Sequence, residues 1–104
     1  MITVAPEILK RKGYGMKVDM WSLGMVLHEL ITTDIPFHDD DEEQFMRNIM
    51  NQELDLEKSM DQETWRTISE NAKSILVSLL DKNPETRISA EEALKHPWFD
   101  DLEV

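Results

Sequence analysis

Several residues in the sequence have side chains that could bind a metal ion, and their spacing decides whether they do. The acidic run from Asp39 to Glu43 supplies carboxylate oxygens, the ligands that Ca²⁺ prefers. An EF-hand loop starting at Asp39 needs glycine at its sixth position and glutamate at its twelfth, where this sequence has Gln44 and Met50. The run is therefore interpreted as the solvated start of a helix and not as a calcium site.

The spacing of the histidines and glycines and the absence of cysteine exclude further kinds of site. His28, His38 and His96 do not have the H-E-x-x-H spacing that places two histidines on one metal ion. The segment Gly13-Tyr14-Gly15 lacks the third glycine of a G-x-G-x-x-G phosphate-binding loop. The chain has no cysteine, which excludes a thiolate zinc site, a disulfide and a cysteine nucleophile. These patterns predict no metal site in this sequence.

The composition indicates a globular domain with an acidic surface. Apolar residues make up 40% of the 104 positions, and 22 acidic residues against 11 basic ones give a net charge of −11. This charge argues against nucleic-acid and anionic-membrane partners, because phosphates are bound by lysine and arginine. It is compatible with basic protein substrates, or simply with a solvated surface. No signal peptide or membrane-spanning run is visible, so an intracellular, cytoplasmic location is expected.

Segment 18–32 is predicted to be a helix that is buried on nearly all sides. Its apolar residues do not form a single stripe: Val18, Met20, Trp21, Leu23, Met25, Val26, Leu27, Leu30 and Ile31. A helix of this kind must be enclosed by protein or lipid, and this one is too short and too polar at its ends for lipid. Pro36 ends the helical stretch, because proline cannot continue a helix. Trp21 is expected in the core.

Shorter helices are predicted to follow. In segment 39–51 acidic residues crowd the first turn, as the helix dipole favours, and Phe45 and Ile49 have helical spacing. Segment 51–62 has weak apolar patterning and predicts a loop.

A third helix over 69–81 is predicted, beginning at about Thr64 or Asn71, with Ser69 as its candidate N-cap. Ser89 and Glu92 have the spacing of a capping box, which predicts a short helix over 89–95. No strand is predicted, so the fold class is expected to be all-α.

Four patterns in order resemble the C-terminal lobe of eukaryotic Ser/Thr protein kinases. They are Ala5-Pro6-Glu7, Asp19-Met20-Trp21-Ser22-Leu23-Gly24, Pro36-Phe37, and Asn83-Pro84-Glu85-Thr86-Arg87-Ile88-Ser89 followed by Ala93-Leu94-Lys95-His96-Pro97-Trp98-Phe99. The ordered set covers essentially the whole chain. The resemblance implies that residues 1–104 are a partial kinase domain, running from the A-P-E motif to the domain end, with helices packed around a buried central helix.

The second half of the sequence resembles the calcium/calmodulin-dependent kinase group, which includes the calcium-dependent protein kinases. The residues that carry this likeness are Trp65, Ile68-Ser69, Ala72-Lys73 and the ending His96-Pro97-Trp98-Phe99. Regulatory calcium-binding or calmodulin-binding segments in such proteins would lie beyond Val104.

The resemblance gives roles to three charged residues. Glu7 of the A-P-E motif is expected to pair with Arg87 and fix the substrate-facing loop, because a guanidinium can meet a carboxylate with two hydrogen bonds. The alternative is that both are ordinary exposed charges. Asp19 is expected to support the catalytic loop by accepting backbone hydrogen bonds, or to serve only as the N-terminal cap of its own helix.

The same resemblance implies a substrate-facing surface. Glu29 matches a glutamate that contacts a basic residue of the peptide substrate, although it could be a plain surface residue. Thr3 and Val4 occupy the loop that shapes the pocket for the residue after the phosphorylated one. Two departures stand out: the family usually has tyrosine in place of Thr3, and Gly-x-Pro in place of Thr33-Asp34-Ile35.

The motifs that perform phosphoryl transfer are missing from this sequence, namely the glycine-rich loop, the strand lysine, H-R-D and D-F-G. The expected function is that of a scaffold fragment: the parent kinase transfers the γ-phosphate of ATP with Mg²⁺, and this chain alone binds neither. The expected partners are protein substrates and the rest of the kinase domain. Without that domain, Met20, Trp21, Val26 and Leu27 are expected to lose cover, which predicts self-association. The alternatives are a non-catalytic, pseudokinase-like interaction module and, least favoured, an unrelated acidic helical bundle.

Overall fold

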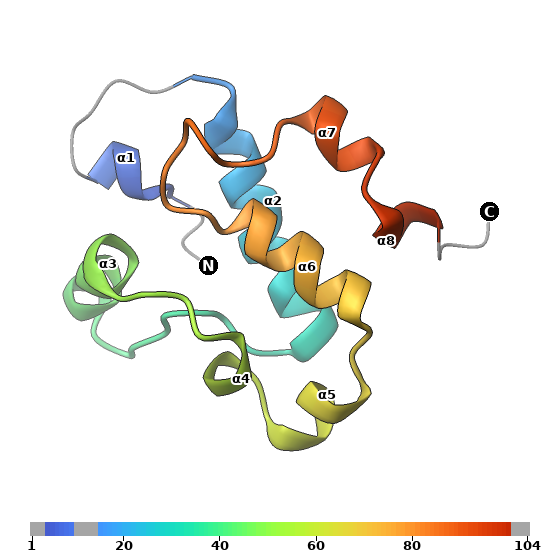
Figure 1. Cartoon of the computed structure of the whole chain (residues 1–104). Coiled ribbons are helices and arrows are strands. Elements are labelled where there is room, and N and C mark those ends of the chain that lie inside the picture. Colours follow the sequence, from blue (N-terminus) through green and yellow to red (C-terminus); the bar gives the residue numbers. More distant parts are fainter. Residues whose placement is uncertain (1–3, 10–14, 101–104) are drawn as a thin grey trace.

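The computed structural model of the chain describes residues 4–9 and 15–100, and within these ranges the secondary structure is helical, without a strand. The elements in chain order are α1 (Pro6–Leu9), α2 (Lys17–Thr32), α3 (Glu42–Asn51), α4 (Leu56–Ser59), α5 (Gln62–Thr67), α6 (Glu70–Leu79), α7 (Ala90–Leu94) and α8 (Pro97–Asp100) (Figure 1). The expected all-α class is confirmed. In the described ranges no helix is long and apolar enough to cross a membrane.

Helices α3 to α7 each begin with a short polar side chain that accepts a hydrogen bond from a backbone amide of the first turn. The caps in order are Asp41, Asp55, Asp61, Ser69 and Ser89. These bonds satisfy amides that a helix start otherwise leaves unpaired. Ser89 also forms the reciprocal capping box with Glu92. The caps set where these short helices begin, and buried apolar residues hold α3, α4, α6 and α7 in place.

Several boundaries differ from those predicted. Helix α2 begins at Lys17, one residue early, and α3 begins at Glu42 because Asp41 is its cap. The loop predicted over 51–62 is wrong in its centre, where Asp55 caps the short helix α4 and Leu56 is buried. The segment after Thr64 is not one helix: α5 ends before Ile68, and α6 starts anew from Ser69.

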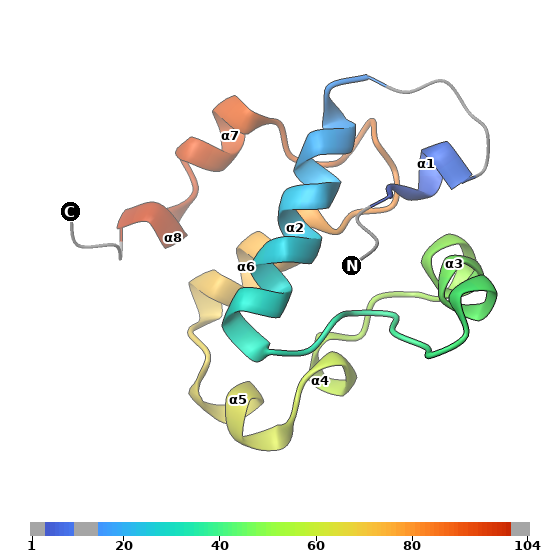
Figure 2. The ribbon, with the colours of Figure 1, turned by 180° about the vertical axis from the view of Figure 1, so that it is seen from behind.

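Helices α2 and α6 cross at the centre of the molecule, where they lie against each other in both views (Figures 1 and 2). Gly24 of α2 is at the crossing. A Cβ atom on Gly24 would lie 2.8 Å from Leu79 Cβ and 3.0 Å from a Leu80 methyl carbon. The glycine therefore allows an approach that a side chain would prevent.

The core extends from this crossing into three buried clusters. One contains Trp21, Met25, Phe37, Phe45, Ile49, Leu80 and Ala5, a second Met20, Ile75, Leu79 and Ala93, and a third Leu56, Met60 and Leu76. The prediction that Met20 and Trp21 lose their cover is wrong, because both are buried in clusters with residues of α3, α6, α7 and the loops. The exposed apolar residues of α2 are instead Leu23, at 46%, and Leu30, at 75%. Val26 and Leu27 are partly exposed.

The turn after α2 contains one departure from the kinase pattern, because Thr33 stands where the family usually has glycine. Thr33 has φ 64° and donates its backbone N–H to the Glu29 carbonyl oxygen at 2.8 Å. This left-handed position after a helix is the one that glycine favours, so threonine holds it with some backbone strain. The turn thus has the left-handed conformation that glycine favours, with threonine in the place of glycine.

We predict that Gly24→Ala destabilises the chain. Alanine favours a helix by about 1 kcal/mol over glycine, but the clash with α6 forces side chains or backbone apart and costs about 1–3 kcal/mol. Urea denaturation should show a net loss of stability. Gly15→Ala is the matched control, since a Cβ there meets nothing within 4 Å. A Gly24→Ala chain as stable as the wild type would contradict the close crossing.

Candidate functional site

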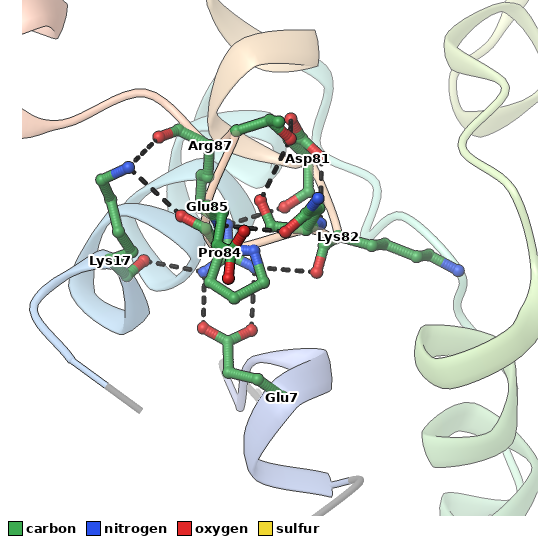
Figure 3. A network of polar contacts seen from close by, with 9 residues as sticks. Glu7, Lys17, Asp81, Lys82, Pro84, Glu85 and Arg87 are labelled. Atoms are coloured by element: carbon green, nitrogen blue, oxygen red, sulfur yellow. Dashed lines mark hydrogen bonds and ion pairs between the residues drawn. The ribbon is translucent and has the colours of Figure 1, made fainter. Parts of the chain in front are cut away.

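The most developed polar site joins two residues from opposite ends of the chain, Glu7 on α1 and Arg87 in the loop between α6 and α7. The guanidinium donates Nη1 to Glu7 Oε2 and Nη2 to Glu7 Oε1, both at 2.8 Å (Figure 3). Glu7 is 2% exposed and Arg87 is 1% exposed. The structure therefore brings together the expected pair as a buried, bidentate contact, and the alternative of two exposed charges is wrong.

The remaining donors of Arg87 also have acceptors. Nε donates to the carbonyl oxygen of Asp81 at 2.7 Å, Nη1 to that of Lys17 at 2.8 Å, and Nη2 to that of Lys82 at 3.4 Å. A guanidinium has five N–H groups, and all of them point at oxygen here. One side chain thus ties α1, the start of α2 and the loop after α6 to each other.

Lys17 closes the same site from the other side. Its ammonium group donates to the carbonyl oxygen of Pro84 at 3.2 Å and also to that of Arg87 (Figure 3). Arg87 in turn donates to the Lys17 carbonyl oxygen, so the two residues hold each other. The sequence analysis missed Lys17. The available signal was a cation in the first turn of a helix, where the dipole disfavours it unless it has a partner elsewhere.

The loop that carries Arg87 is shaped by its own polar side chains. Asp81 accepts from the Asn83 amide at 3.0 Å and from the Thr86 hydroxyl at 2.6 Å. Asn83 accepts from the Glu85 amide at 3.0 Å. Asparagine and aspartate commonly make such local turns. The matched segment from Asn83 to Ser89 is therefore a shaped support for one arginine.

Apolar groups surround the ion pair. The guanidinium carbon of Arg87 lies 5.3 Å from the centre of the Trp21 ring, and Trp21 stacks on Phe37 with centroids 6.1 Å apart. An arginine over an aromatic face is attracted by the ring quadrupole. Ala5 and Pro6 are also buried beside Glu7. The pair is thus shielded from water.

The electrostatics of Glu7 follow from this environment. Burial alone raises the pKa of the Glu7 carboxyl, but the hydrogen bonds from Arg87 and from its own backbone, together with the Arg87 charge, bring that pKa below its ordinary value. Glu7 is therefore an ionised and fully engaged carboxylate. A group in this state holds structure and does not act as a general base.

Asp19 does not cap its helix. The N-cap of α2 is Met16, which has no side-chain capping bond, and Asp19 is an exposed residue in the first turn. The capping alternative is therefore wrong, because α2 starts at Lys17, three residues earlier than a cap at Asp19 would require.

The structure describes two of the three residues that are expected to face the substrate. Glu29 is half-buried, and its Oε2 atom is buried with no hydrogen-bond partner among the described residues. Val4 is half-buried next to the A-P-E segment, while Thr3 lies outside the described ranges. Over residues 4–9 and 15–100 no group of three or more His, Asp or Glu could hold a metal ion. The Glu7–Arg87 site thus anchors segments of the chain to one another.

Comparison with known proteins gives the family. A family model described as the protein kinase domain matches residues 3–99. The chain is 43% identical over 98 residues to calcium-dependent protein kinase 4 of Arabidopsis thaliana, an alignment that covers 94% of this chain and 19% of that protein. It is 36% identical to the putative ribosomal protein S6 kinase alpha-1 of Caenorhabditis elegans, covering 97% of this chain and 13% of that protein.

A solved structure agrees. The chain matches the structure titled "Titin kinase and its flanking domains" with a TM-score of 0.85 and 34% identity, over 96% of this chain and 18% of that one. The chain spans about a fifth of the length of the calcium-dependent kinases that it matches. The resemblance to those kinases expected from the second half of the sequence is confirmed. With the family model matched over residues 3–99, the chain belongs to the protein kinase domain family.

Proposed function

We propose that this chain is the C-terminal lobe scaffold of a Ser/Thr protein kinase that transfers the γ-phosphate of ATP to protein substrates. The observation that carries the proposal is the buried Glu7–Arg87 pair within a family match over residues 3–99. The pair anchors the A-P-E segment, which follows the loop expected to face the substrate. In this role the chain positions the substrate and performs none of the chemistry.

We assign substrate contacts to Glu29, Val4 and Thr3. Glu29 is half-buried late on α2, and it carries a carboxylate. An arginine or lysine of a peptide substrate is a donor that suits such a group. The net charge of −11 favours the approach of such basic substrates.

Asp19 is proposed to support the catalytic loop of the complete kinase. Its exposed carboxylate at the start of α2 has free acceptor capacity, which suits several backbone amides. The residues that bind ATP and Mg²⁺ in that kinase would lie outside these 104 positions, because the glycine-rich, H-R-D and D-F-G motifs are absent from the sequence. We place the protein inside the cell, in the cytoplasm, where ATP and protein substrates are at hand.

The rest of the kinase domain is proposed to cover an apolar surface on α2. A cleft of about 200 Å³ lies between α2, α6, α7 and α8, and its lining is wholly apolar: Leu23, Leu27, Ile75, Leu79, Ala93, Trp98 and Phe99. Leu30 is exposed one turn further along α2. Exposed apolar patches of this kind mark association surfaces. The alternative, a non-catalytic pseudokinase-like interaction module, would have the same scaffold. It would differ from the favoured function in that its parent protein would lack the H-R-D and D-F-G motifs.

We predict that Arg87→Ala in the complete kinase domain reduces both stability and activity. Removing the guanidinium strands the buried Glu7 carboxylate, which costs about 3–5 kcal/mol. Chemical denaturation and peptide phosphorylation would measure the two effects. Arg47→Ala is the matched control, because the Arg47–Glu43 pair is exposed and its loss costs about 1 kcal/mol or less. If both variants behaved like the wild type, the anchoring role of Arg87 would be refuted.

We predict that the 104-residue chain has no kinase activity and does not bind ATP. Isothermal calorimetry with ATP, with and without Mg²⁺, should give no heat of binding. Heat that depends on Mg²⁺ would contradict the scaffold assignment. Activity in a parent protein with intact H-R-D and D-F-G motifs would separate the enzyme fragment from the pseudokinase-like module.

We predict that the 104-residue chain self-associates through α2 when the rest of the kinase domain is absent. Leu23→Gln together with Leu30→Gln should shift light scattering towards the monomer, because both variants remove exposed apolar area. Val77→Gln is the control, since Val77 is 52% exposed but does not line the cleft. A wild-type chain that is already monomeric would overturn this prediction.

A further inference from the structure

A groove of about 2020 Å³ runs along the face of α6 that is opposite to the apolar cleft. The α6 residues that line it recur at intervals of three to four, as on one face of a helix: Glu70, Lys73, Ser74, Val77 and Ser78. Helices α4 and α5 and the segment before α4 form the facing wall (Figure 1), and Leu56 of α4 packs with Leu76 of α6. Pockets for small molecules usually hold about 300–1,000 Å³, so this groove has room for a segment of polypeptide.

The charge of this groove is strongly negative. Eight of the residues that line it are aspartate or glutamate, whereas three are lysine. Two of the lysines already have partners inside the chain. Lys73 pairs with Glu70 at 3.1 Å, and Lys82 donates to the backbone carbonyl oxygens of Asn48 and Gln52. The groove therefore has more carboxylates than its own cations can neutralise.

The carboxylates of the groove are accessible to a partner. Glu53 and Glu57 are exposed, and neither forms an ion pair with another of the described residues. Asp61 accepts hydrogen bonds from the backbone amide and the hydroxyl of Thr64, and these bonds lower the pKa of its carboxyl. Carboxylates of this kind are ionised at neutral pH. They suit lysine and arginine side chains as partners and repel the phosphates of nucleic acids.

Apolar side chains lie among these carboxylates. Leu54 and Trp65 are half-buried in the lining, and Val77 on the α6 face is 52% exposed. A metal ion makes no use of apolar groups, whereas a peptide with a large apolar side chain gains free energy by covering them. The combination of charge and apolar surface therefore favours a peptide over a small cation.

We propose that this groove is a docking site for a basic peptide segment, whose lysine and arginine side chains meet the carboxylates and whose apolar side chain packs on Val77. Charges of opposite sign on two surfaces speed their encounter and fix the orientation of the bound chain. Helix α6 has 10 residues and so rises about 15 Å, a length that about five residues of extended chain match.

The groove is separate from the surface that was assigned to substrate contact. Neither Glu29 nor Val4 lines it. The proposal therefore adds a second contact area, for a basic protein partner. It does not depend on the kinase function proposed above, because binding in the groove needs neither ATP nor phosphoryl transfer.

The test uses the pentapeptide Lys-Arg-Leu-Arg-Lys as the probe, added to the isotope-labelled 104-residue chain at about 0.15 M salt. We expect saturable NMR shift changes at the backbone amides of Glu70, Ser74 and Val77 and at the indole N–H of Trp65. The peptide Lys-Arg-Gly-Arg-Lys has the same charge and no apolar side chain, so it should bind about threefold or more weakly.

Matched variants separate docking from a general attraction to an acidic chain. Glu53→Gln with Glu57→Gln should weaken the binding of the leucine peptide about threefold to tenfold, because two charges that line the groove are lost. Glu63→Gln with Glu91→Gln removes the same charge from exposed positions outside the lining, and should change the affinity by less than about twofold. Val77→Ser should weaken the leucine peptide more than the glycine peptide.

The shift map of the wild-type chain decides the question if a variant does not fold. Shift changes confined to other faces of the molecule, or no saturable binding of the leucine peptide, would overturn the docking site. Equal weakening by the two pairs of glutamine substitutions would also overturn it, because the peptide would then respond to the net charge alone.

Discussion

The buried contact between Glu7 and Arg87 is the constraint on which the arrangement of this molecule depends, since it joins residues 80 positions apart in the sequence. A buried charge is tolerable only when its partners replace water, and here each N–H of the guanidinium has an oxygen acceptor. Such a pair by itself adds little to the free energy of unfolding, because well-packed apolar residues in the same space would stabilise the fold as well. In this arrangement α1, the start of α2 and the 81–87 loop together satisfy all the donors of Arg87.

Much of the fold is predictable from local chemistry. Ser69 caps α6, and Ser89 forms its capping box with Glu92, as their spacing indicates. The all-round apolar pattern of α2 predicts its central place. Helices α4 and α5 could not be predicted in this way, because a helix of four to six residues is too short to show a helical period of apolar residues. Their caps, Asp55 and Asp61, were visible but are indistinguishable from other acidic residues in an acidic chain.

The residues of the candidate site could be predicted only in part from local sequence patterns. Spacing alone does not connect Glu7 with Arg87, and the expectation that they pair came from motif resemblance. The bonds of Lys17 to the Pro84 carbonyl and of His28 to the Ser59 hydroxyl join segments that are distant in the sequence, and such contacts leave no local pattern. The capping interpretation of Asp19 failed for a simpler reason, namely that a helix boundary is uncertain by a residue or two without its cap.

The central helix is thus fixed by three different kinds of force along its length. At its start, Lys17 is held by hydrogen bonds to and from the Arg87 loop, where a permanent charge is balanced by a carboxylate. At its middle, Gly24 lets α6 approach closely, and the contact is apolar. At its end, His28 is hydrogen-bonded to Ser59 of α4, and burial lowers the pKa of its ring, which favours the neutral form. Arg87 stays charged at every physiological pH, whereas burial favours the uncharged ring of His28. The contact at the start of α2 is therefore one between full charges, whereas the contact at its end joins neutral hydrogen-bonding groups.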